Sequence, residues 1–302
     1  MSKSGLSNTP KVTIIILNWN GKEDTIELIK SLDNLTYPNY EILIIDNNSI
    51  DGSYNYFKNN YPSIKIIQTG DNFGYAKGNN IGIQESINSG SDYSLIINND
   101  TLVEPEFLDK LIKVYESEKN IGLISPLIYE PSKNSKINKV QFKCQKINWY
   151  KGFPENNKEK FINKKFIETE LISGACFLVK NEIINTIGFI PTEYFMLWED
   201  LDYSINALKK GYKNLCVIDS VVFHKTSQSL NKINNKRLRY STRNRFIFLY
   251  KYSTKSQFIC SSLWFIFIFT PIVFMYFTLK GRKLDFIKFY VYGIIDFISI
   301  RM

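Results

Sequence analysis

The chain has 302 residues, 44% hydrophobic and 22% charged, a composition that excludes a disordered protein and allows one large core or two modest ones. Its four cysteines, Cys144, Cys176, Cys216 and Cys260, form no C-x-x-C pair, which argues against a zinc ribbon or a disulfide framework and fits a reducing compartment. The net charge of +9 is uneven: from Lys225 onward 14 basic and two acidic residues give +12, whereas 24 basic and 27 acidic residues before it give −3.

The first part of the chain predicts alternating strands and helices, after a polar segment, 1–11, that lacks the features of a signal peptide. Short apolar, β-branched runs predict strands at 12–17, 40–45, 64–67 and 93–97. Helical spacing of apolar residues predicts helices at 22–35, 51–57, 75–89 and 107–115. Asp51 is expected to cap the second helix and Pro105 to open the fourth. This alternation predicts an α/β fold, a mostly parallel sheet with helices on both faces.

In such a sheet ligands bind beyond the carboxyl ends of the strands. Polar residues follow the predicted strands and should gather on that edge: Asn18, Asn20, Asp46, Asn47 and Asp100. The Lys- and Asn-rich stretch 132–165 predicts a loop or a small excursion over the site. A strand-like run follows at 171–179, and a helix is expected from Trp198 to Lys210.

The charged tail also contains an apolar stretch. Residues 257–279 include no charged residue, and about 20 predominantly apolar residues suffice to cross a bilayer. Pro271 is expected to kink this helix, and a second aromatic stretch follows at 286–300. Basic clusters flank the first stretch on both sides, which favours a hairpin or an in-plane attachment to an anionic cytoplasmic leaflet. A buried helix of a soluble domain is the alternative; nucleic-acid binding is not expected, since no recognition motif accompanies the charge.

Several familiar chemistries lack their residues here. The chain contains no G-x-x-x-x-G-K-S/T loop, and no G-x-G-x-x-G follows the first strand. Its single histidine, His224, leaves little material for a His-rich metal site or a Ser-His-Asp triad. Carboxylates and amides at strand ends remain, and these groups suit a phosphate ester held through a hard cation.

Six segments, taken together, resemble the family 2 glycosyltransferases and most closely their rhamnosyltransferase-like branch. In chain order they are Thr13–Asn20, Ile45–Ser53, Asn72–Asn80, Ile97–Asp100, Ser173–Cys176 and Trp198–Asp202, with His224 after them. The resemblance covers about 12–224 and implies a GT-A fold, an inverting transfer from a nucleotide diphosphate sugar, and a divalent metal, Mg²⁺ or Mn²⁺.

The resemblance also implies a donor-binding set. Asp46 matches the carboxylate that accepts hydrogen bonds from the nucleobase or ribose of the donor, although Asp before two Asn residues is also a common turn. Gly74 permits a positive φ or a close approach of the backbone to a ligand, and the helix N-terminus at Ala76 to Asn79 offers amides. The full donor set expected is Asn18, Asn20, Asp46, Asn47, Asn72, Gly74, Ala76, Asn79, Asn98 and Asn99.

Asn98-Asn99-Asp100 stands where the family has its D-x-D motif, whose carboxylates bind the metal that bridges the donor phosphates. Asn98 replaces the first aspartate, so an amide oxygen stands in for a charged ligand and Asp100 is the motif's one carboxylate. His224 matches a histidine that completes the metal coordination in related enzymes; a structural role is the alternative.

Glu199-Asp200 resembles the family's E-D motif. Asp200 is expected to be the general base that takes the proton of the acceptor hydroxyl, and Glu199 to orient the acceptor or the base. Trp198 is the candidate for stacking on an acceptor sugar, with burial as the alternative. Asp202 is expected to interact with the helix dipole. Lys225 and Arg243-Asn244-Arg245 are expected to contact the diphosphate or lipid headgroups, or to be solvated charge.

The sequence therefore predicts a GT-A domain at 10–229 and a membrane-attachment region at 230–302. The expected reaction transfers a hexose or deoxyhexose, rhamnose among the candidates, from a nucleotide diphosphate sugar to a surface-polysaccharide or lipid-linked glycan acceptor. The expected location is the cytoplasmic face of the cell membrane. A nucleotidyltransferase and a non-catalytic glycan-binding protein are the alternatives.

Overall fold

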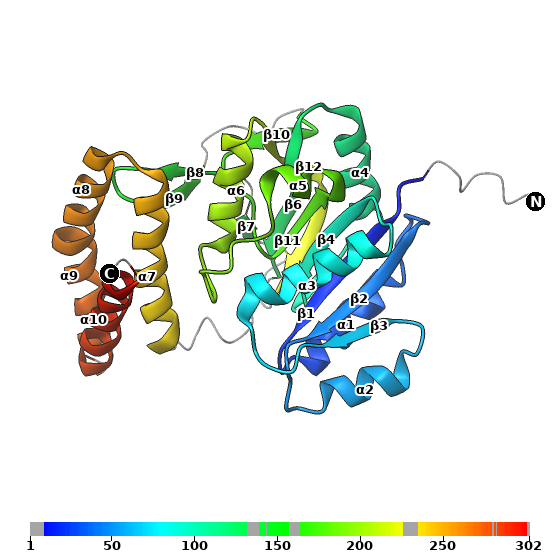
Figure 1. The fold of residues 1–302 in the computed structure, drawn as a ribbon, viewed down its shortest axis with the longest axis horizontal. Coiled ribbons are helices and arrows are strands. Elements are labelled where there is room, and N and C mark those ends of the chain that lie inside the picture. The colour runs from blue at the N-terminus through cyan, green and yellow to red at the C-terminus, as the bar shows by residue number, and fades with distance from the viewer. Residues whose placement is uncertain are drawn as a thin grey trace, which may run out of the picture.

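The computed structural model describes residues 9–131, 139–142, 144–156, 164–225, 235–279, 281 and 283–300. Figure 1 shows a sheet covered by helices and, beside it, a bundle of C-terminal helices. The predicted boundary at 229/230 lies outside the described residues. Cys144, Cys176, Cys216 and Cys260 form no disulfide with any described residue.

Ten strands form the main sheet, and two more form a separate hairpin. The strands of the main sheet are β1 (Val12–Asn18), β2 (Tyr40–Asp46), β3 (Lys65–Gln68), β4 (Tyr93–Asn98), β5 (Thr101–Val103), β6 (Ile121–Glu130), β7 (Lys139–Phe142), β10 (Phe166–Thr169), β11 (Cys176–Lys180) and β12 (Lys213–His224). The hairpin consists of β8 (Gln145–Asn148) and β9 (Phe153–Asn156).

The strand order is β10-β12-β6-β11-β4-β1-β2-β3, with β5 paired to β12 and β7 to β6. Strands β3, β2, β1 and β4 are parallel neighbours, and β6 and β12 are parallel to each other. Strand β11 lies between the two groups and runs antiparallel to both β4 and β6, so the strands of the two groups run in the same direction. The prediction of an α/β fold with a mostly parallel sheet is therefore confirmed.

Helices cover both faces of this sheet. They are α1 (Lys22–Leu32), α2 (Ser53–Asn60), α3 (Gly74–Asn88), α4 (Phe107–Ser117), α5 (Asn181–Ile187) and α6 (Glu199–Lys209). Alternate residues of β1 point to opposite faces: Ile14 and Ile16 join the core under α1, α2 and α4, whereas Ile15 joins the core under α3, α5 and α6. Two apolar layers thus fix the sheet between its helices.

The C-terminal bundle contains α7 (Asn235–Tyr252), α8 (Lys255–Trp264), the π-helical turn η1 (Phe265–Phe269), α9 (Thr270–Leu279) and α10 (Lys283–Ser299). Elements α8, η1 and α9 form one helix, Lys255–Leu279, which in the described part of the chain is the one long and apolar enough to cross a membrane. The helix continues through Pro271, and the wide turn directly before it accommodates the missing amide. A capping box at Thr254 and Gln257 starts it.

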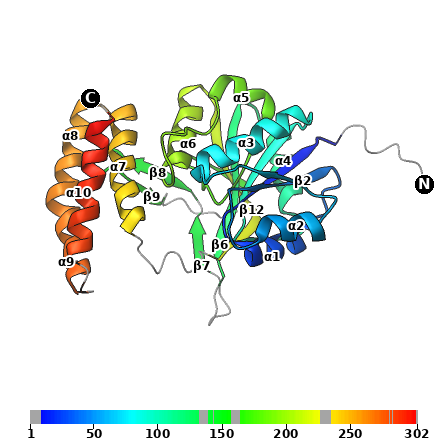
Figure 2. The same ribbon diagram turned by 60° about the horizontal axis from the view of Figure 1, so that its bottom comes forward.

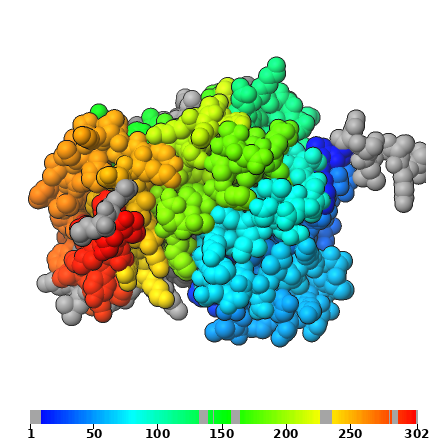
Figure 3. Space-filling view, viewed as in Figure 1, coloured from blue at the N-terminus to red at the C-terminus, as the bar shows by residue number. Residues whose placement is uncertain are grey.

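A third apolar cluster joins the bundle to the sheet. It includes Tyr194, Trp198 and Ile205 around α6, Ile147 of the hairpin, and Ile247, Phe248 and Leu249 of α7. Figure 2 shows the hairpin β8–β9 reaching toward α7, and Figure 3 shows the bundle packed against the middle of the chain. Helix α7 therefore shares a core with α6 and with the hairpin β8–β9.

The prediction of a loop at 132–165 is wrong in part. Strands β7, β8 and β9 lie within this stretch, while 132–138, 143 and 157–163 lie outside the described residues. These strands are short and scarcely buried, although they are paired. Because they carry polar Lys and Asn side chains, the sequence did not predict them. The expected strand at 171–179 begins only at Cys176, and the first helix ends at Leu32.

Candidate active site

The parallel register brings the ends of three strands together. Asn18 of β1 lies opposite Asp46 of β2, and Leu17 lies opposite Asn98 of β4. The gathering of polar residues at one edge, which the sequence predicts, follows directly from this register.

At this edge Asp46 is fully buried in a hydrogen-bond network. Asn18 Nδ2 donates to its Oδ1 at 2.9 Å, and the Ser49 amide donates to its Oδ2 at 3.0 Å. The Ser49 hydroxyl accepts from the Asn20 amide, and the Asn20 side chain accepts from the Ile50 amide. Asp46 thus holds the loop after β2, and each of its carboxylate oxygens can accept one further hydrogen bond.

A second network builds the entry to α3. The Asn47 side chain accepts from the Phe73 amide at 3.1 Å and donates to Asn72 Oδ1 and to the Gly74 carbonyl, both at 3.1 Å. Gly74 has φ +75°, as the sequence predicts, and a Cβ there would lie 2.3 Å from the carbonyl oxygen of Phe195. Only glycine fits this position.

Three other predicted donor residues face inward. Ala76 is fully buried under the sheet, and the buried Asn79 donates to the Tyr75 carbonyl. Asn99 Nδ2 donates to the Gly21 carbonyl at 3.2 Å and to the Thr25 hydroxyl at 3.1 Å, which braces the start of α1. In this arrangement these side chains hold the backbone in place. A bound sugar donor would therefore contact the backbone atoms of these residues rather than their side chains.

The predicted metal pair lies together. Strand β5 pairs antiparallel with β12 and places Thr101 opposite His224, so that His224 Nε2 lies 3.1 Å from Asp100 Oδ1. On its other side His224 Nδ1 lies 3.0 Å from Gln141 Oε1 of β7. With the Nδ1 proton donated to Gln141, Nε2 presents the lone pair that a metal requires.

One carboxylate and one imidazole fit Mn²⁺ or Mg²⁺ as part of a coordination shell. In the described ranges no group of three or more His, Cys, Asp or Glu side chains lies together so that it could hold a metal. Asn98 is half-buried at the end of β4, and its backbone N–H donates to the Ala175 carbonyl.

The start of α6 supplies the carboxylate pair. Asp200 Oδ2 accepts from the Gly174 amide at 2.9 Å, and its Oδ1 accepts from the Leu201 amide at 2.9 Å. Burial raises the pKa of Asp200, while these two amide bonds lower it. Burial and the nearby Asp200 raise the pKa of Glu199 well above its usual range, and Glu199 Oε2 has no hydrogen-bond partner among the described residues. Asp200 is therefore the member of the pair that ionises first.

The segment that carries Gly174 connects Asp200 to the end of β4. The Ala175 carbonyl accepts from the Asn98 amide, and the Gly174 carbonyl accepts from the Tyr75 hydroxyl of α3. Asp200, Tyr75 and Asn98 thus contact one short stretch of backbone. Asp200 therefore lies at the carboxyl edge of the sheet, beside the end of β4.

The backbone just before the pair is in an uncommon conformation. Leu197 has φ +69° and Trp198 has φ +79°, the left-handed region that non-glycine residues rarely adopt. The fully buried Asn244 of α7 donates to the Met196 and Leu197 carbonyls, both at 2.8 Å. Trp198 is 7% exposed and packs against Phe153 and Phe248, so it offers an acceptor sugar little ring surface.

The expectation of a dipole partner at Asp202 is incomplete. This buried carboxylate accepts from the Tyr194 hydroxyl at 2.8 Å, the Tyr252 hydroxyl at 2.6 Å and Lys251 Nζ at 2.9 Å. It therefore ties α6 to the end of α7. Lys225, expected at the diphosphate or a headgroup, instead pairs with Asp24 and Glu27 of α1.

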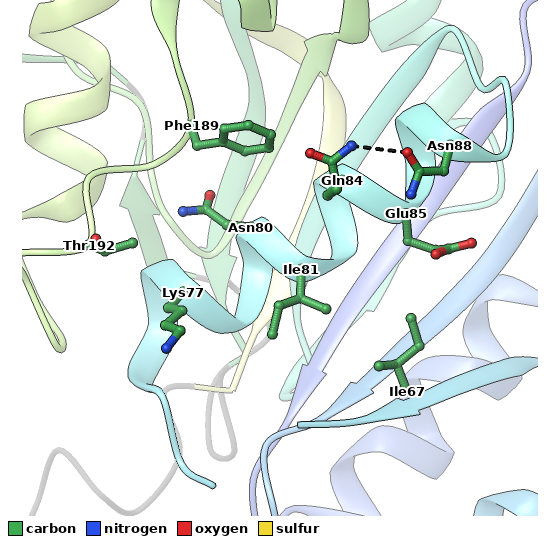
Figure 4. Close-up of a pocket in the computed structure, with 9 residues that line it drawn as sticks. All are labelled: Ile67, Lys77, Asn80, Ile81, Gln84, Glu85, Asn88, Phe189 and Thr192. Carbon is green, nitrogen blue, oxygen red and sulfur yellow. Dashed lines mark hydrogen bonds between the residues drawn. The ribbon is translucent and has the colours of Figure 1, made fainter. Parts of the chain in front are cut away.

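A cavity of about 650 Å³ is an open depression along the outer side of α3 (Figure 4). Ile67, Lys77, Ile81 and Phe189 are among its lining residues. None of the predicted site residues lines it. The chemistry of the carboxyl edge is thus separate from this depression.

Three residues at the edge were not predicted from the sequence as site residues. Tyr75 follows Gly74 inside a recognised motif, and its polar hydroxyl is the signal that could have marked it. Ser49 also lies in a recognised motif. Gln141 has no such signal, because it belongs to a strand in the stretch expected to be a loop.

Fold and site define an α/β enzyme with acidic and amide groups at one sheet edge. The model of the glycosyl transferase family 2 matches residues 13–188, more than half of the chain, and the chain belongs to this family. It is a glycosyltransferase, which decides against the two alternatives, a nucleotidyltransferase and a non-catalytic glycan-binding protein.

Two curated relatives agree with this assignment. The chain is 22% identical over 238 residues to a low-salt glycan biosynthesis hexosyltransferase of Haloferax volcanii, which covers 78% of this chain and 74% of the relative. It is 22% identical over 259 residues to an N-acetylglucosaminyl-diphospho-decaprenol L-rhamnosyltransferase of Mycobacterium tuberculosis, covering 80% and 84%.

A solved structure agrees on the fold. A mannosyltransferase of Pyrobaculum calidifontis, in complex with GDP-Man and Mn²⁺, superimposes with a TM-score of 0.61 at 12% identity, covering 98% of this chain and 89% of that one. The prediction of a family 2 glycosyltransferase with a GT-A fold is confirmed.

Proposed function

We propose that the protein transfers a hexose or deoxyhexose, with inversion, from a nucleotide diphosphate sugar to a lipid-linked glycan. The observation that carries this proposal is the meeting of two groups of residues at one sheet edge. Asp100 and His224 lie 3.1 Å apart there, and Asp200 is joined to the end of β4 through Gly174 and Ala175. A hexosyl and a rhamnosyl transferase among the relatives support the class of sugar.

Asp100 and His224 would hold the divalent metal, with Gln141 fixing the imidazole. The cation, when bound, neutralises the charge that develops on the departing diphosphate. Asn98 would offer a side-chain amide oxygen where the D-x-D motif of the family has its first aspartate. The networks of Asp46 and Asn47 would shape the loops that receive the nucleoside.

Asp200 would act as the general base. As the acceptor oxygen forms its bond to the anomeric carbon, the bond from that carbon to the diphosphate oxygen breaks, and its electron pair leaves with the nucleoside diphosphate. The acceptor hydroxyl proton passes to the Asp200 carboxylate. Glu199, whose pKa is raised further, would be protonated and would orient Asp200 or the acceptor.

The acceptor and the location follow from the C-terminal part. The helix Lys255–Leu279 has 25 residues and exposes Ile266, Phe267 and Ile268. An apolar helix between basic clusters suits the cytoplasmic face of a membrane. One relative acts, by its name, on a diphospho-decaprenol. We assign 10–229 to catalysis and 230–302 to attachment, with α7 shared between them.

The test uses the full chain in detergent with a panel of nucleotide diphosphate sugars, with Mn²⁺ or with a chelator. One donor should raise the melting temperature and be slowly hydrolysed with Mn²⁺ alone. Stabilisation that is equal with and without the metal would remove the metal from the proposal. A panel without any binding donor would refute the nucleotide-sugar activity itself.

A further inference from the structure

A small cavity of about 90 Å³ lies inside the C-terminal bundle. It is lined by Leu238, Ser241, Thr242 and Arg245 of α7, Phe265, Phe269, Thr270 and Val273 of the apolar helix, Tyr290 of α10 and Phe153 of the hairpin. Several of these residues, Phe269, Thr270 and Tyr290 among them, are partly exposed, so the cavity reaches toward the surface.

Arg245 is the one charged residue of this lining, and its side chain is 1% exposed. Its Nη2 donates to the Lys151 carbonyl at 2.9 Å and to the Ser261 carbonyl at 2.8 Å. Gly152 has φ +67°, and a Cβ there would come within 2.6 Å of Nη2, so this turn is shaped to admit the guanidinium.

The other nitrogens of Arg245 are unpartnered. Nε and Nη1 are buried and make no hydrogen bond to any described residue. The rings of Phe265 and Phe153 lie 4.2 and 5.1 Å from the guanidinium carbon, but no carboxylate pairs with it among the described side chains. Burial lowers the pKa of Arg245 to about 9. A buried cation without an anion is costly, so the site is built for a negative partner.

We propose that this cavity binds a phosphate group of the lipid-linked acceptor through Nε and Nη1 of Arg245. At about 30 Å³ for each water in the liquid, the cavity has room for about three waters, a space similar to that of a phosphate group. Hydroxyls of Ser241 and Thr242 on the lining add hydrogen-bonding groups, whereas the Thr270 hydroxyl already donates to the Phe265 carbonyl. Arginine suits phosphate because its planar fork donates two parallel hydrogen bonds.

The position of the cavity suits a lipid phosphate. One wall is the apolar helix, at its π-helical turn Phe265–Phe269, a feature frequent at functional sites. Phe153 packs against Phe265 and Phe269 of this helix and also contacts Arg245 and Trp198, the residue just before the proposed catalytic pair. A phosphate held by Arg245 would therefore lie between the membrane-type helix and the loop of the base. This inference rests on the proposed lipid-linked acceptor.

The test compares three ligands on the full chain in detergent: decaprenyl phosphate, decaprenol and inorganic phosphate. Binding is measured from the rise in melting temperature. Decaprenyl phosphate should stabilise the wild type more than decaprenol does, and inorganic phosphate should not stabilise it at lipid concentrations. Arg245→Met should bind decaprenyl phosphate about 10- to 100-fold more weakly, the usual loss for a charge-assisted hydrogen bond, with decaprenol binding unchanged.

Arg239→Met is the matched control, because it removes one charge from the same helix at a residue that pairs with Asp296 and does not line the cavity. Equal weakening in both variants, or equal binding of inorganic phosphate, would overturn the inference. If Arg245→Met does not fold, Arg245→Lys keeps the charge without the fork and should still lose the preference for the phosphate.

Manganese-dependent donor hydrolysis, measured on the same samples, reports the proposed function separately. It should persist in the control Arg239→Met, since Arg239 pairs with Asp296 of α10 and does not line the cavity. Hydrolysis without any preference of the wild type for decaprenyl phosphate would refute the phosphate site and leave the transferase intact.

Discussion

Replacing Asn244 by alanine should slow catalysis far more than it unfolds the protein. Asn244 donates two hydrogen bonds to the carbonyls of Met196 and Leu197, at 2.8 Å each. These bonds hold Leu197 and Trp198 at positive φ directly before the base. Without them the loop is free to relax to an ordinary conformation.

The magnitudes decide which effect dominates. Leaving two buried carbonyls unpaired costs about 2–6 kcal/mol in all. Returning two residues from the left-handed region recovers about 1–2 kcal/mol each. The net loss of unfolding free energy is then between about −2 and 4 kcal/mol. A displaced Asp200 should nevertheless lower kcat about 100-fold, since an error of about 1 Å in a catalytic group has that effect.

The assay measures kcat and the donor KM of Asn244→Ala, together with its melting temperature. A fall in kcat with an unchanged donor KM is expected, because Asn244 does not touch the donor edge. Asn244→Asp is a useful second variant: it keeps the size of the side chain but cannot donate. If Asn244→Ala loses stability by more than about 4 kcal/mol while kcat stays within about twofold of the wild type, Asn244 has a purely structural role.

Four further outcomes are expected. Asp200→Asn should lower transfer about 100- to 10,000-fold without weakening donor binding; in the wild type, kcat should fall with decreasing pH at a value above about 3.9, because the raised pKa leaves Asp200 protonated below it. Asp100→Asn should abolish the Mn²⁺-dependent part of nucleotide binding, measured by calorimetry with and without chelator. Gly74→Ala should lower the melting temperature by several degrees, since its Cβ would meet the Phe195 carbonyl at 2.3 Å. Asp202→Ala should cost about 2–4 kcal/mol in thermal or chemical unfolding, whereas a helix-dipole role alone predicts at most about 1 kcal/mol.

The strand-end residues could be predicted from the sequence because local rules determine them. If the sheet is parallel, a strand that ends at Asp46 and another that ends at Asn98 finish at the same edge, and the register places these two ends on either side of the end of β1. The positive φ of Gly74 follows in the same way from a glycine in a helix-entry loop. These features need no knowledge of distant contacts.

Other features depend on packing between distant segments. Asp100 meets His224 because β5 pairs with β12, a pairing between strands more than 100 residues apart that neither strand signals. The burial of Asp46 and Trp198 could not be predicted either, since a polar or aromatic residue near a strand or helix end is equally common on the surface. The surroundings of Arg245 could not be predicted, because they include the hairpin β8–β9. The sequence did not predict this hairpin, since its strands are short and polar.

Helix α7 has a consequence for how the enzyme could be divided. One of its faces contributes Ile247, Phe248 and Leu249 to the core around Trp198, while its end continues into the apolar helix. A fragment cut before α7 would lose both an apolar layer and the brace of the catalytic loop. In the proposed function, attachment and catalysis are therefore mechanically coupled, and a tilt of the apolar helix within a bilayer would be transmitted through Asn244 to Asp200.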